Sequence, residues 1–490
     1  MTTSGSASGA QMYETHISIV FMVGDQAFKL KKPVKLDFID LSTRELRQRC
    51  CEREVELNRR LAPDVYLGVA DIVGPDGALC DHMVVMRRMP ADRRLSTLAQ
   101  RGAVTESELV ELAQVLANFH DHAETSSAIG AAGTVDRIGE RWEAGFHEIA
   151  PFVGPVLDPR TEEEIQALCR RYLAGRRPLF ADRVSGGRVR DGHGDLLADD
   201  VFLLPDGPRV LDCLEFDDQL RYGDVLADLA FLVMDLERVG APDLGITLLD
   251  HYGELSGERF PATLTHHYIA MRAHIRAKVA CLRESQGDPD AADEARRLHE
   301  MTRAHLQQGR VALVLVGGTP GTGKSTVAAG IGAHMGWNVI RSDEIRKDLA
   351  HVEPTTRLTA AFGQGAYDQA STAATYREML ERARGDLEFG KCVVLDATWH
   401  DAAWRDYAAD LAARTNSDLV ELRCDAPFAV TEQRIRERNR GGQDASDATP
   451  GIAAQVEQAT DPWPSATRVD TASDPSTALE IALRALGYRG

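Results

Sequence analysis

The N-terminal part of the chain alternates apolar and polar positions at the period of a β-strand. Residues 13–32 read YETHISIVFMVGDQAFKLKK, and a Gly-Asp pair interrupts the alternation. Because successive side chains of a strand point to opposite faces, this pattern predicts a β-hairpin with a Gly-Asp turn. A charged helix is predicted over 42–61, and short strands are predicted over 66–73 and 83–86.

Helical periodicity dominates the middle of the chain. Apolar residues recur at helical spacing over 106–123 and 161–173, and two or three apolar helices are predicted over 224–283. Between them, residues 191–216 predict a loop and two short strands joined at a Pro-Asp-Gly turn. This mixture of a small sheet with several helices indicates an α+β domain.

The pattern changes again near residue 309. Residues 284–308 are dense in charge and alanine, and they predict a loop and a surface helix that bridges two domains. The following residues alternate strand, glycine-rich turn, helix, strand and helix, which is typical of βαβ units and a parallel sheet. We therefore predict an α/β and α+β two-domain protein, with a disordered tail over 1–12, domains over 13–283 and 309–490, and a linker helix over 284–308.

Composition restricts the classes of protein to consider. The chain of 490 residues is 43% hydrophobic and 27% charged, which is ordinary for a globular protein. No apolar run approaches the roughly 20 residues that span a bilayer, and the first residues do not resemble a secretory signal. The eight cysteines form no CxxC pair, which argues against a structural zinc site or a disulfide framework. We expect a cytoplasmic protein with no membrane partner.

The net charge bears on possible partners. A formal charge of −19 repels a nucleic-acid backbone, and aromatic residues are not interleaved with basic ones. Nucleic acid is therefore not the expected partner.

A P-loop follows the first apolar strand of the C-terminal domain. The run 311–316 is apolar throughout, and the next residues match G-x-x-x-x-G-K-[ST]. Backbone N–H groups of such a loop bind phosphate, Lys324 reaches the β- and γ-phosphates, and Ser325 offers a hydroxyl to Mg²⁺. The predicted nucleotide-binding residues are Gly318, Thr319, Pro320, Gly321, Thr322, Gly323, Lys324, Ser325 and Thr326.

Two acidic residues follow the next strands of that domain. Asp343 and Arg346 lie three positions apart on a predicted helix, where the carboxylate can orient or deprotonate an acceptor hydroxyl and the guanidinium can bind the substrate. Asp396 ends the strand 392–395 and suits a carboxylate that holds Mg²⁺. The alternative for each Asp is a helix cap.

A cluster of arginines lies further along, over 431–440. Arg434 and Arg438 are one helical turn apart, as expected for a lid that neutralises a transferring phosphoryl group. The alternative is a solvated run of charge.

Together the segments GTPGTGKS, RSDEIRK, VVLDATW and RIRERNR resemble the P-loop kinase group of gluconate kinases, zeta toxins and polynucleotide kinases. The resemblance covers roughly 309–490. It implies that Asp343 acts on the acceptor hydroxyl, that Arg346 binds substrate and that Arg434 or Arg438 is the lid arginine. The segment 467–471 is a weak match to the family's adenine-contacting segment.

The N-terminal domain contains His193-Gly194-Asp195 followed by Asp200, which is similar to the HGDxxxxN loop of aminoglycoside and choline kinase-like phosphotransferases. The resemblance implies that Asp195 is the base and that Asp200, which stands where the family has Asn, binds Mg²⁺. A second Mg²⁺ ligand is implied at Asp212, with Glu215 as the alternative.

The same resemblance implies a lysine that binds the α- and β-phosphates and a glutamate that pairs with it. Lys29 and Glu54 suit these roles, and Lys31 and Glu52 are the alternatives. No G-x-G-x-x-G motif precedes Lys29, so the domain can be an active kinase or a degenerate nucleotide-binding domain. Both modules in this order resemble bacterial bifunctional aminoglycoside-phosphotransferase-like and P-loop ATP-binding proteins.

We therefore predict an ATP- and Mg²⁺-dependent phosphotransferase whose acceptor is a hydroxyl of a small molecule. The alternatives are a nucleotide-gated binding protein with slow ATPase activity and a polynucleotide 5′-hydroxyl kinase. The identity of the acceptor does not follow from the sequence.

Overall fold

The computed structural model describes residues 10–15, 17–36, 39–352, 368–441, 449–472 and 474–487. The chain divides into two compact units, which we call the N-terminal and C-terminal units. The N-terminal unit comprises Met1–Gln166, Phe180–Phe260 and Leu264–Leu306, and the C-terminal unit comprises Ala167–Leu179, Pro261–Thr263 and Gln307–Gly490.

The N-terminal unit begins with an antiparallel sheet. Its strand order is β1-β2-β3-β7-β6. The predicted hairpin is confirmed, because β2 and β3 pair in a register that leaves Gly24 and Asp25 as the turn. The strands are β1 (Ala10–Glu14), β2 (Ser18–Val23), β3 (Gln26–Lys31), β6 (Tyr66–Val73) and β7 (Leu79–Arg87), with a separate short pair β4 (Lys35–Leu36) and β5 (Ile39–Asp40).

The helix α1 (Arg44–Asn58) packs on this sheet. Thr43 caps its N-terminus by accepting a hydrogen bond from the backbone N–H of Leu46. Cys51 and Val55 of the helix join Val84 of β7 in one hydrophobic cluster. This packing fixes the face of α1 that carries Glu54, which is fully buried.

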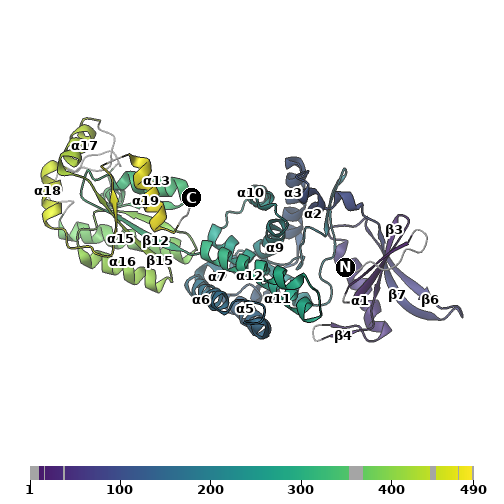
Figure 1. Ribbon diagram of the computed structural model, residues 1–490. Helices are drawn as coiled ribbons and strands as arrows, with labels where there is room; N and C mark the ends of the chain where they lie inside the picture. The colour runs from purple at the N-terminus through teal and green to yellow at the C-terminus, as the bar shows by residue number, and fades with distance from the viewer. Residues whose placement is uncertain are drawn as a thin grey trace. The chain divides into compact units, whose positions relative to one another are not determined.

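Helices and short strands build the rest of the N-terminal unit, although residues 167–179, 261–263 and 307–308 of these helical segments are part of the C-terminal unit (Figure 1). The short strands are β8 (Val189–Asp191), β9 (Val201–Leu204), β10 (Gly207–Val210) and β11 (Tyr222–Asp224). The helices, with two 3-10 turns, are η1 (Ala91–Arg93), α2 (Leu95–Gln100), α3 (Glu106–His122), α4 (Ser127–Ala131), α5 (Val135–Ile149), η2 (Ala150–Phe152), α6 (Pro159–Gly175), α7 (Arg177–Ser185), α8 (Asp218–Arg221), α9 (Val225–Arg238), α10 (Pro242–Ser256), α11 (Ala262–Ser285) and α12 (Ala291–Gln308).

Two segments differ from the sequence prediction. Residues 10–12, expected in a disordered tail, form the start of β1 because they pair with β2, whereas 1–9 lie outside the described residues. The expected linker 284–308 ends in α12, most of which belongs to the N-terminal unit. His299 of α12 lies 2.9 Å from Glu162, and Leu298 is buried, so the helix packs as an integral part of that unit.

The C-terminal unit is built on a sheet of order β13-β14-β12-β15-β16, in which every pairing is parallel. Figure 1 shows α13 and α19 on one side of this sheet and α15 and α16 on the other. The six residues of β12 are all buried, as expected for a central parallel strand. The strands are β12 (Ala312–Gly317), β13 (Asn338–Arg341), β14 (Val393–Asp396), β15 (Asp418–Asp425) and β16 (Thr467–Asp470).

The order of these strands reverses on either side of β12. Ligands of open α/β sheets bind at the carboxyl ends of the strands beside such a reversal. The carboxyl end of β12 is therefore the expected position of the site. The surrounding helices are α13 (Lys324–Met335), α14 (Ser342–Leu349), α15 (Gln369–Glu388), α16 (Ala402–Arg414), α17 (Phe428–Gly441), α18 (Pro450–Gln458) and α19 (Pro475–Ala485).

Candidate functional site

The loop between β12 and α13 has the backbone of a phosphate-binding loop. Gly318, Gly321 and Gly323 have φ values of 139°, 86° and 81°, which side chains other than glycine rarely allow. A Cβ on Gly318 would lie 2.6 Å from the carbonyl oxygen of Cys424, and a Cβ on Gly321 would lie 2.6 Å from that of Thr431. The loop therefore needs glycine both for its conformation and for the close approach of its neighbours.

Lys324 is the first residue of α13, so the phosphate-binding residues meet the N-terminus of a helix. Thr319 and Pro320 form the turn of the loop, and the Thr322 hydroxyl donates to the Thr319 carbonyl at 2.7 Å. Ser325 is partly buried at the start of the helix, and Thr326 is exposed. Helix N-terminal N–H groups and the helix dipole favour an anion at this position.

Asp396 lies at the carboxyl end of β14, directly opposite Val316 of β12. Its side chain is 3% exposed, and Arg341 lies 3.3 Å from its Oδ2 atom. The buried Oδ1 atom has no hydrogen-bond partner in the part of the chain that the structure describes. An unsatisfied carboxylate oxygen beside the phosphate-binding loop fits a water-bound Mg²⁺, which prefers oxygen ligands and retains several of its waters.

Asp343 and Arg346 of α14 lie together, with Arg346 Nη1 donating to Asp343 Oδ1 at 2.8 Å. They belong to the helix that follows β13, at the same edge of the sheet as the phosphate-binding loop. Their charges reach the buried Tyr376 hydroxyl, although burial is the main cause that raises the pKa of Tyr376. The pair combines a carboxylate that accepts a proton with a guanidinium that binds an anion or a polar group.

Arg434 of α17 lies against the phosphate-binding loop. A Cβ on Gly323 would be 3.5 Å from its Nη1 atom, and its Nη2 atom donates to the Thr471 carbonyl at 2.7 Å. Thr471, the last residue of the segment 467–471, therefore binds Arg434 through its backbone carbonyl. The side chain of Arg438, the other arginine proposed for the lid, lies outside the described residues.

Residues after Asp396 complete this edge, and no role was predicted for them from the sequence. Trp399 is fully buried with a φ of 51°, a strained conformation for a bulky residue. The Thr398 carbonyl accepts from the backbone N–H of Gly318 at 3.2 Å, and its hydroxyl lies 3.0 Å from Nδ1 of His400. The only signal in the sequence is the Trp-His pair behind the strand-ending Asp.

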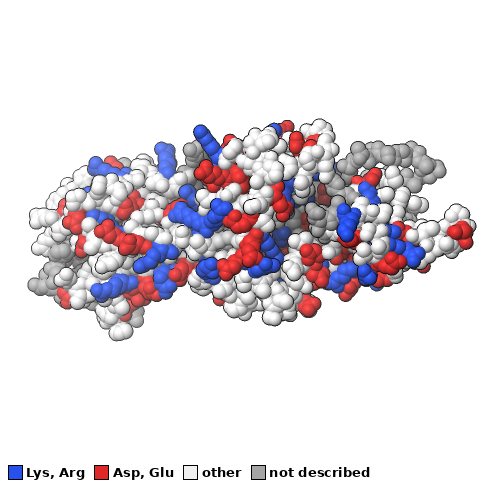
Figure 2. Space-filling model, turned by 90° about the horizontal axis from the view of Figure 1, so that it is seen from below, with Lys and Arg blue, Asp and Glu red and all other residues white. Residues whose placement is uncertain are grey.

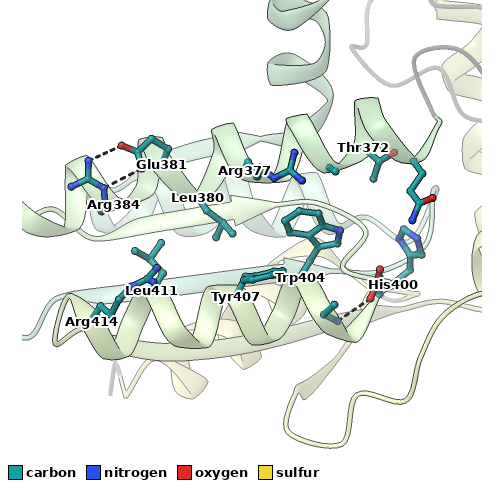
Figure 3. A pocket seen from close by; sticks show the side chains of 14 residues that line it. Thr372, Arg377, Leu380, Glu381, Arg384, His400, Trp404, Tyr407, Leu411 and Arg414 are labelled. Atoms are coloured by element: carbon teal, nitrogen blue, oxygen red, sulfur yellow. Dashed lines mark hydrogen bonds and ion pairs between the residues drawn. The ribbon is translucent and has the colours of Figure 1, made fainter.

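A groove of about 770 Å³ begins at His400 and runs between α15 and α16 (Figure 3). Trp404 lies between His400 and Tyr407 in this groove and stacks on Tyr376, with ring centroids 5.1 Å apart. Arg377 and Arg414 line the groove without an ion-pair or hydrogen-bond partner among the described residues. The groove therefore joins an aromatic surface to uncompensated positive charge next to the phosphate-binding edge.

The N-terminal unit brings Lys29 and Glu54 together at 2.8 Å. Lys31 lies on the same face of β3 and contacts Glu54 at 2.5 Å, so both candidate lysines share one buried glutamate. Lys31 also contacts Glu215 at 2.5 Å and is itself fully buried. Glu52 is exposed, which removes it as the alternative partner. Lys29 is the lysine with part of its side chain open to a ligand.

Asp212, which contacts Lys29, also interacts with the carboxylates of Asp195 and Asp200. Asp212 lies 2.6 Å from the Nζ atom of Lys29 and has a φ of 64°, in the left-handed region that residues other than glycine rarely adopt. Burial and the charges of Asp212 and Asp195 raise the pKa of Asp200 well above its usual value. Neighbouring carboxylates repel one another, and a divalent cation bound to their oxygen atoms would reduce this repulsion.

Asp212 is the better candidate than Glu215 for the second metal ligand. Glu215 is 6% exposed and is bound to Lys31, whereas the Asp212 side chain is 51% exposed and acts on the pKa of both Asp195 and Asp200. Among the described residues, no three His, Cys, Asp or Glu side chains are arranged to hold a metal by themselves. Phosphate oxygens or water would complete the coordination.

Asp195 has the properties of a base that works near neutrality. Burial raises the pKa of its carboxyl to about 6, and Asp212 adds to this, whereas Arg276 and Arg272 lower it. Its loop is held by Asp228, whose carboxylate accepts from the backbone N–H groups of His193 at 2.6 Å and Gly194 at 2.9 Å. Asp228 thus positions the loop that carries Asp195, as well as contacting His120 of α3.

Two family models match the chain. The model described as "Phosphotransferase enzyme family" matches residues 41–264, and the model described as "AAA domain" matches residues 313–462. These matches define a two-domain protein with a phosphotransferase-type N-terminal domain and a P-loop kinase-type C-terminal domain, which confirms the predicted fold class.

Relatives share this whole arrangement. The chain is 43% identical over 459 residues to Rv2004c of Mycobacterium tuberculosis and to Mb2027c of Mycobacterium bovis, which spans 94% of this chain and 92% of each relative. Both relatives carry the name "Uncharacterized protein". The chain belongs to the family of these mycobacterial proteins.

Solved structures resemble the two halves separately. A gluconokinase from Sinorhizobium meliloti 1021 is 18% identical, with 36% of this chain and 91% of that chain covered and a TM-score of 0.26. A GDP and kanamycin complex of APH(2")-IIia is 16% identical, with 61% of this chain and 94% of that chain covered and a TM-score of 0.42.

Among the helices of the described residues, none combines the length and the apolar composition that a membrane-spanning helix needs.

Proposed function

We propose that this protein is a kinase whose C-terminal site transfers the γ-phosphoryl group of Mg-ATP to a hydroxyl of a small metabolite. The observation that carries this proposal is the phosphate-binding loop at the end of β12, with buried Asp396 beside it. Loop N–H groups and Lys324 bind the β- and γ-phosphates. Asp396 and Ser325 would hold Mg²⁺, which neutralises phosphate charge when bound.

Each residue of the C-terminal site has a separate role in the proposed phosphoryl transfer. Asp343 accepts the proton of the acceptor hydroxyl, and that oxygen forms a bond to the γ-phosphorus. The bond from the γ-phosphorus to the β–γ bridging oxygen breaks, and the electron pair leaves with ADP. Lys324 and Arg434 stabilise the negative charge that develops on the transferring group, because both lie at the phosphate-binding loop.

The groove between α15 and α16 supplies further surface for the acceptor. It starts at His400, which is linked through Thr398 to Gly318 of the phosphate-binding loop. Its Trp404 offers a ring to stack on, and Arg377 offers a guanidinium that no described residue pairs with (Figure 3). The part of an acceptor that lies away from its reacting hydroxyl would therefore extend along this groove.

Phosphotransfer at the N-terminal site is a second candidate activity. It is favoured by the Lys29–Glu54 pair and by the raised pKa of Asp195, which suits a general base. The missing glycine loop before Lys29 is consistent with a degenerate site, for which binding without transfer is the alternative. A nucleotide-gated binding protein would show slow ATP hydrolysis that no acceptor accelerates.

A polynucleotide acceptor has less support. On the face drawn in Figure 2, basic and acidic side chains of the described residues are interspersed. The net charge is −19, which repels the negatively charged phosphate backbone of a nucleic acid.

The deciding experiment is Mg-ATP turnover with a panel of acceptors: hexoses, aldonates, amino sugars, choline, nucleosides and a 5′-hydroxyl oligonucleotide. It is run on the intact protein and on Lys324→Ala and Asp195→Ala variants. Acceptor-dependent ADP formation that only Lys324→Ala abolishes supports the C-terminal kinase. Loss in Asp195→Ala alone assigns the reaction to the N-terminal site, and a basal rate that no acceptor changes contradicts the kinase proposal.

A further inference from the structure

Three arginines come together on two neighbouring helices of the N-terminal unit. Arg272 and Arg276 lie one turn apart on α11 and therefore share a face. Arg141 lies on α5, which packs beside α11. Trp142 of α5 donates from Nε1 to Nε2 of His267 at 3.3 Å, as part of this packing.

These arginines border the catalytic loop. The Nε atom of Arg272 donates to the carbonyl of Ala227 at 3.0 Å, next to the Asp228 that holds the backbone before Asp195. The positive charges of Arg276 and Arg272 both act on Asp195 and lower its pKa against the larger effect of burial. Arg272 and Arg276 are therefore close enough to the proposed base for their charges to act on it.

No carboxylate among the described residues forms an ion pair with Arg141, Arg272 or Arg276. Arg141 donates to the carbonyls of Gln219 and Tyr222, and Arg272 lies over the ring of Phe231, whereas Arg276 has no hydrogen-bond partner among those residues. Burial lowers the pKa of Arg141, and the charge of Arg272 lowers it further, so the two repel each other. Elsewhere on the same two helices a basic residue does have an acidic partner, since Lys278 of α11 lies 2.5 Å from Glu148 of α5.

Positive charges that are partly buried and uncompensated are unfavourable unless an anion joins them. Guanidinium groups bind phosphate and carboxylate in a bidentate manner, which makes them suited to such a ligand.

We propose that the molecule bound beside Asp195 carries a negatively charged phosphate or carboxylate, which Arg276, Arg272 and Arg141 bind while its hydroxyl faces Asp195. This inference rests on the proposed N-terminal phosphotransfer for the hydroxyl, but the anion site stands on the arginines themselves. Cationic acceptors such as aminoglycosides or choline would be repelled by the same three charges.

The first test maps arginine modification in the intact Lys324→Ala protein, in which the P-loop is disabled. The protein is treated with phenylglyoxal, with and without inorganic phosphate, and the modified arginines are located by mass spectrometry. We expect phosphate, but not choline, to protect Arg276 and Arg272. Arg137 is the control, because it is 54% exposed and pairs with Glu140, and phosphate should leave its modification unchanged. Equal modification of Arg276 with and without phosphate would overturn the anion site.

The second test compares acceptors of one ring but different charge: glucosamine, glucose, gluconate and glucose 6-phosphate. With Lys324→Ala protein we expect turnover with an anionic acceptor, and a loss of about 10- to 100-fold in kcat/KM in Arg276→Gln. Gluconate and glucose 6-phosphate distinguish carboxylate from phosphate. Lys278→Gln on the same helix is the control and should retain turnover, and Arg276→Lys should restore part of it.

The outcomes separate the two proposals. Fastest turnover with glucosamine would overturn the anionic acceptor while supporting N-terminal phosphotransfer. Protection of Arg276 by phosphate, without turnover of any acceptor, would support the anion site and count against N-terminal phosphotransfer.

Discussion

The Nη2 atom of Arg434 donates to the carbonyl oxygen of Thr471 at 2.7 Å. The hydroxyl oxygen of Thr471 in turn lies 2.5 Å from the carbonyl oxygen of Thr322 and 3.0 Å from that of Asp425, and its one proton is shared between these two acceptors. Arg434 is therefore anchored to the phosphate-binding loop through one threonine. An arginine held in this way is pre-organised to face a transferring phosphoryl group, because its position is set before the reaction.

We predict that Arg434→Ala lowers kcat of the P-loop reaction by about 10²- to 10³-fold, the range for the loss of one donor to a transition-state oxyanion. ATP binding should change much less, since the loop and Lys324 remain. Steady-state kinetics with the accelerating acceptor, together with ATP binding by calorimetry, measure both quantities.

The matched control is Arg436→Ala. Arg436 lies on the same helix but is 64% exposed and pairs with Glu432 at 2.9 Å. Its removal should leave kcat within a few-fold of the intact protein. Equal losses from both substitutions would show that Arg434 acts only through the general charge of α17.

The second prediction is a pH profile for the N-terminal reaction, measured in Lys324→Ala protein. Asp195 accepts a proton only when ionised, and burial raises its pKa to about 6. The value of kcat/KM should therefore fall about tenfold per pH unit below pH 6, whereas an ordinary Asp with a pKa of about 4 would keep it constant to about pH 5. Arg276→Gln removes a charge that lowers this pKa, so the fall should move to higher pH.

An Asp195→Asn variant is the control for this profile, and it should have no activity at any pH. A rate that stays constant down to pH 5 in the Lys324→Ala protein would contradict the role of Asp195 as a buried base.

Much of the fold could be predicted from local patterns. The β2–β3 hairpin follows from strict alternation, and the parallel sheet follows from an apolar run before a glycine turn. The place of α12 could not be predicted in this way. Its charged residues are typical of an exposed linker, but Leu298 and the His299–Glu162 contact bury one face against elements far away in the sequence.

The candidate sites show the same division. The P-loop could be predicted from the spacing of its glycines, because its backbone conformation requires glycine at these positions. In contrast, Arg341 becomes the neighbour of Asp396 only when β13 pairs with β14, and Arg276 meets Asp195 only when α11 packs beside the catalytic loop. Lys29 and Lys31 share Glu54, so the choice between them depended on exposure, which the sequence does not contain.

The third prediction concerns Asp200. Burial and the neighbouring Asp212 and Asp195 raise its pKa, so its ionised form destabilises the folded protein at any pH above the pKa of an unfolded Asp. Asp200→Asn removes this unfavourable charge and should raise the Tm at pH 8 without Mg²⁺. It should also remove the stabilisation that Mg²⁺ gives to the N-terminal unit of Lys324→Ala protein.

Asp199→Asn is the control, because Asp199 is 55% exposed. It accepts a hydrogen bond from Ser96 at 2.5 Å, so its substitution should not raise the Tm. Differential scanning calorimetry with and without Mg²⁺ tests both variants. A lower Tm for Asp200→Asn without metal would contradict the proposed repulsion.

The fourth prediction concerns the groove between α15 and α16. Two arginines of α15 allow a matched comparison. Arg377 lines the groove and has no partner within the described ranges, whereas Arg382 lies outside the groove and pairs with Glu378 at 2.8 Å. If the acceptor extends along the groove, Arg377→Gln should raise its KM by about tenfold with little change in kcat, since a distal contact is made equally in the ground and transition states. Arg382→Gln should leave both constants unchanged.

Trp404→Ala should act in the same direction as Arg377→Gln, because it removes the ring on which the acceptor would stack. The Tm of each variant is measured alongside, since Trp404 also stacks on Tyr376. Unchanged KM values in Arg377→Gln and Trp404→Ala, with folded proteins, would restrict acceptor binding to the Asp343–Arg346 pair. An equal rise of KM in Arg382→Gln would instead attribute the effect to the surface charge of α15.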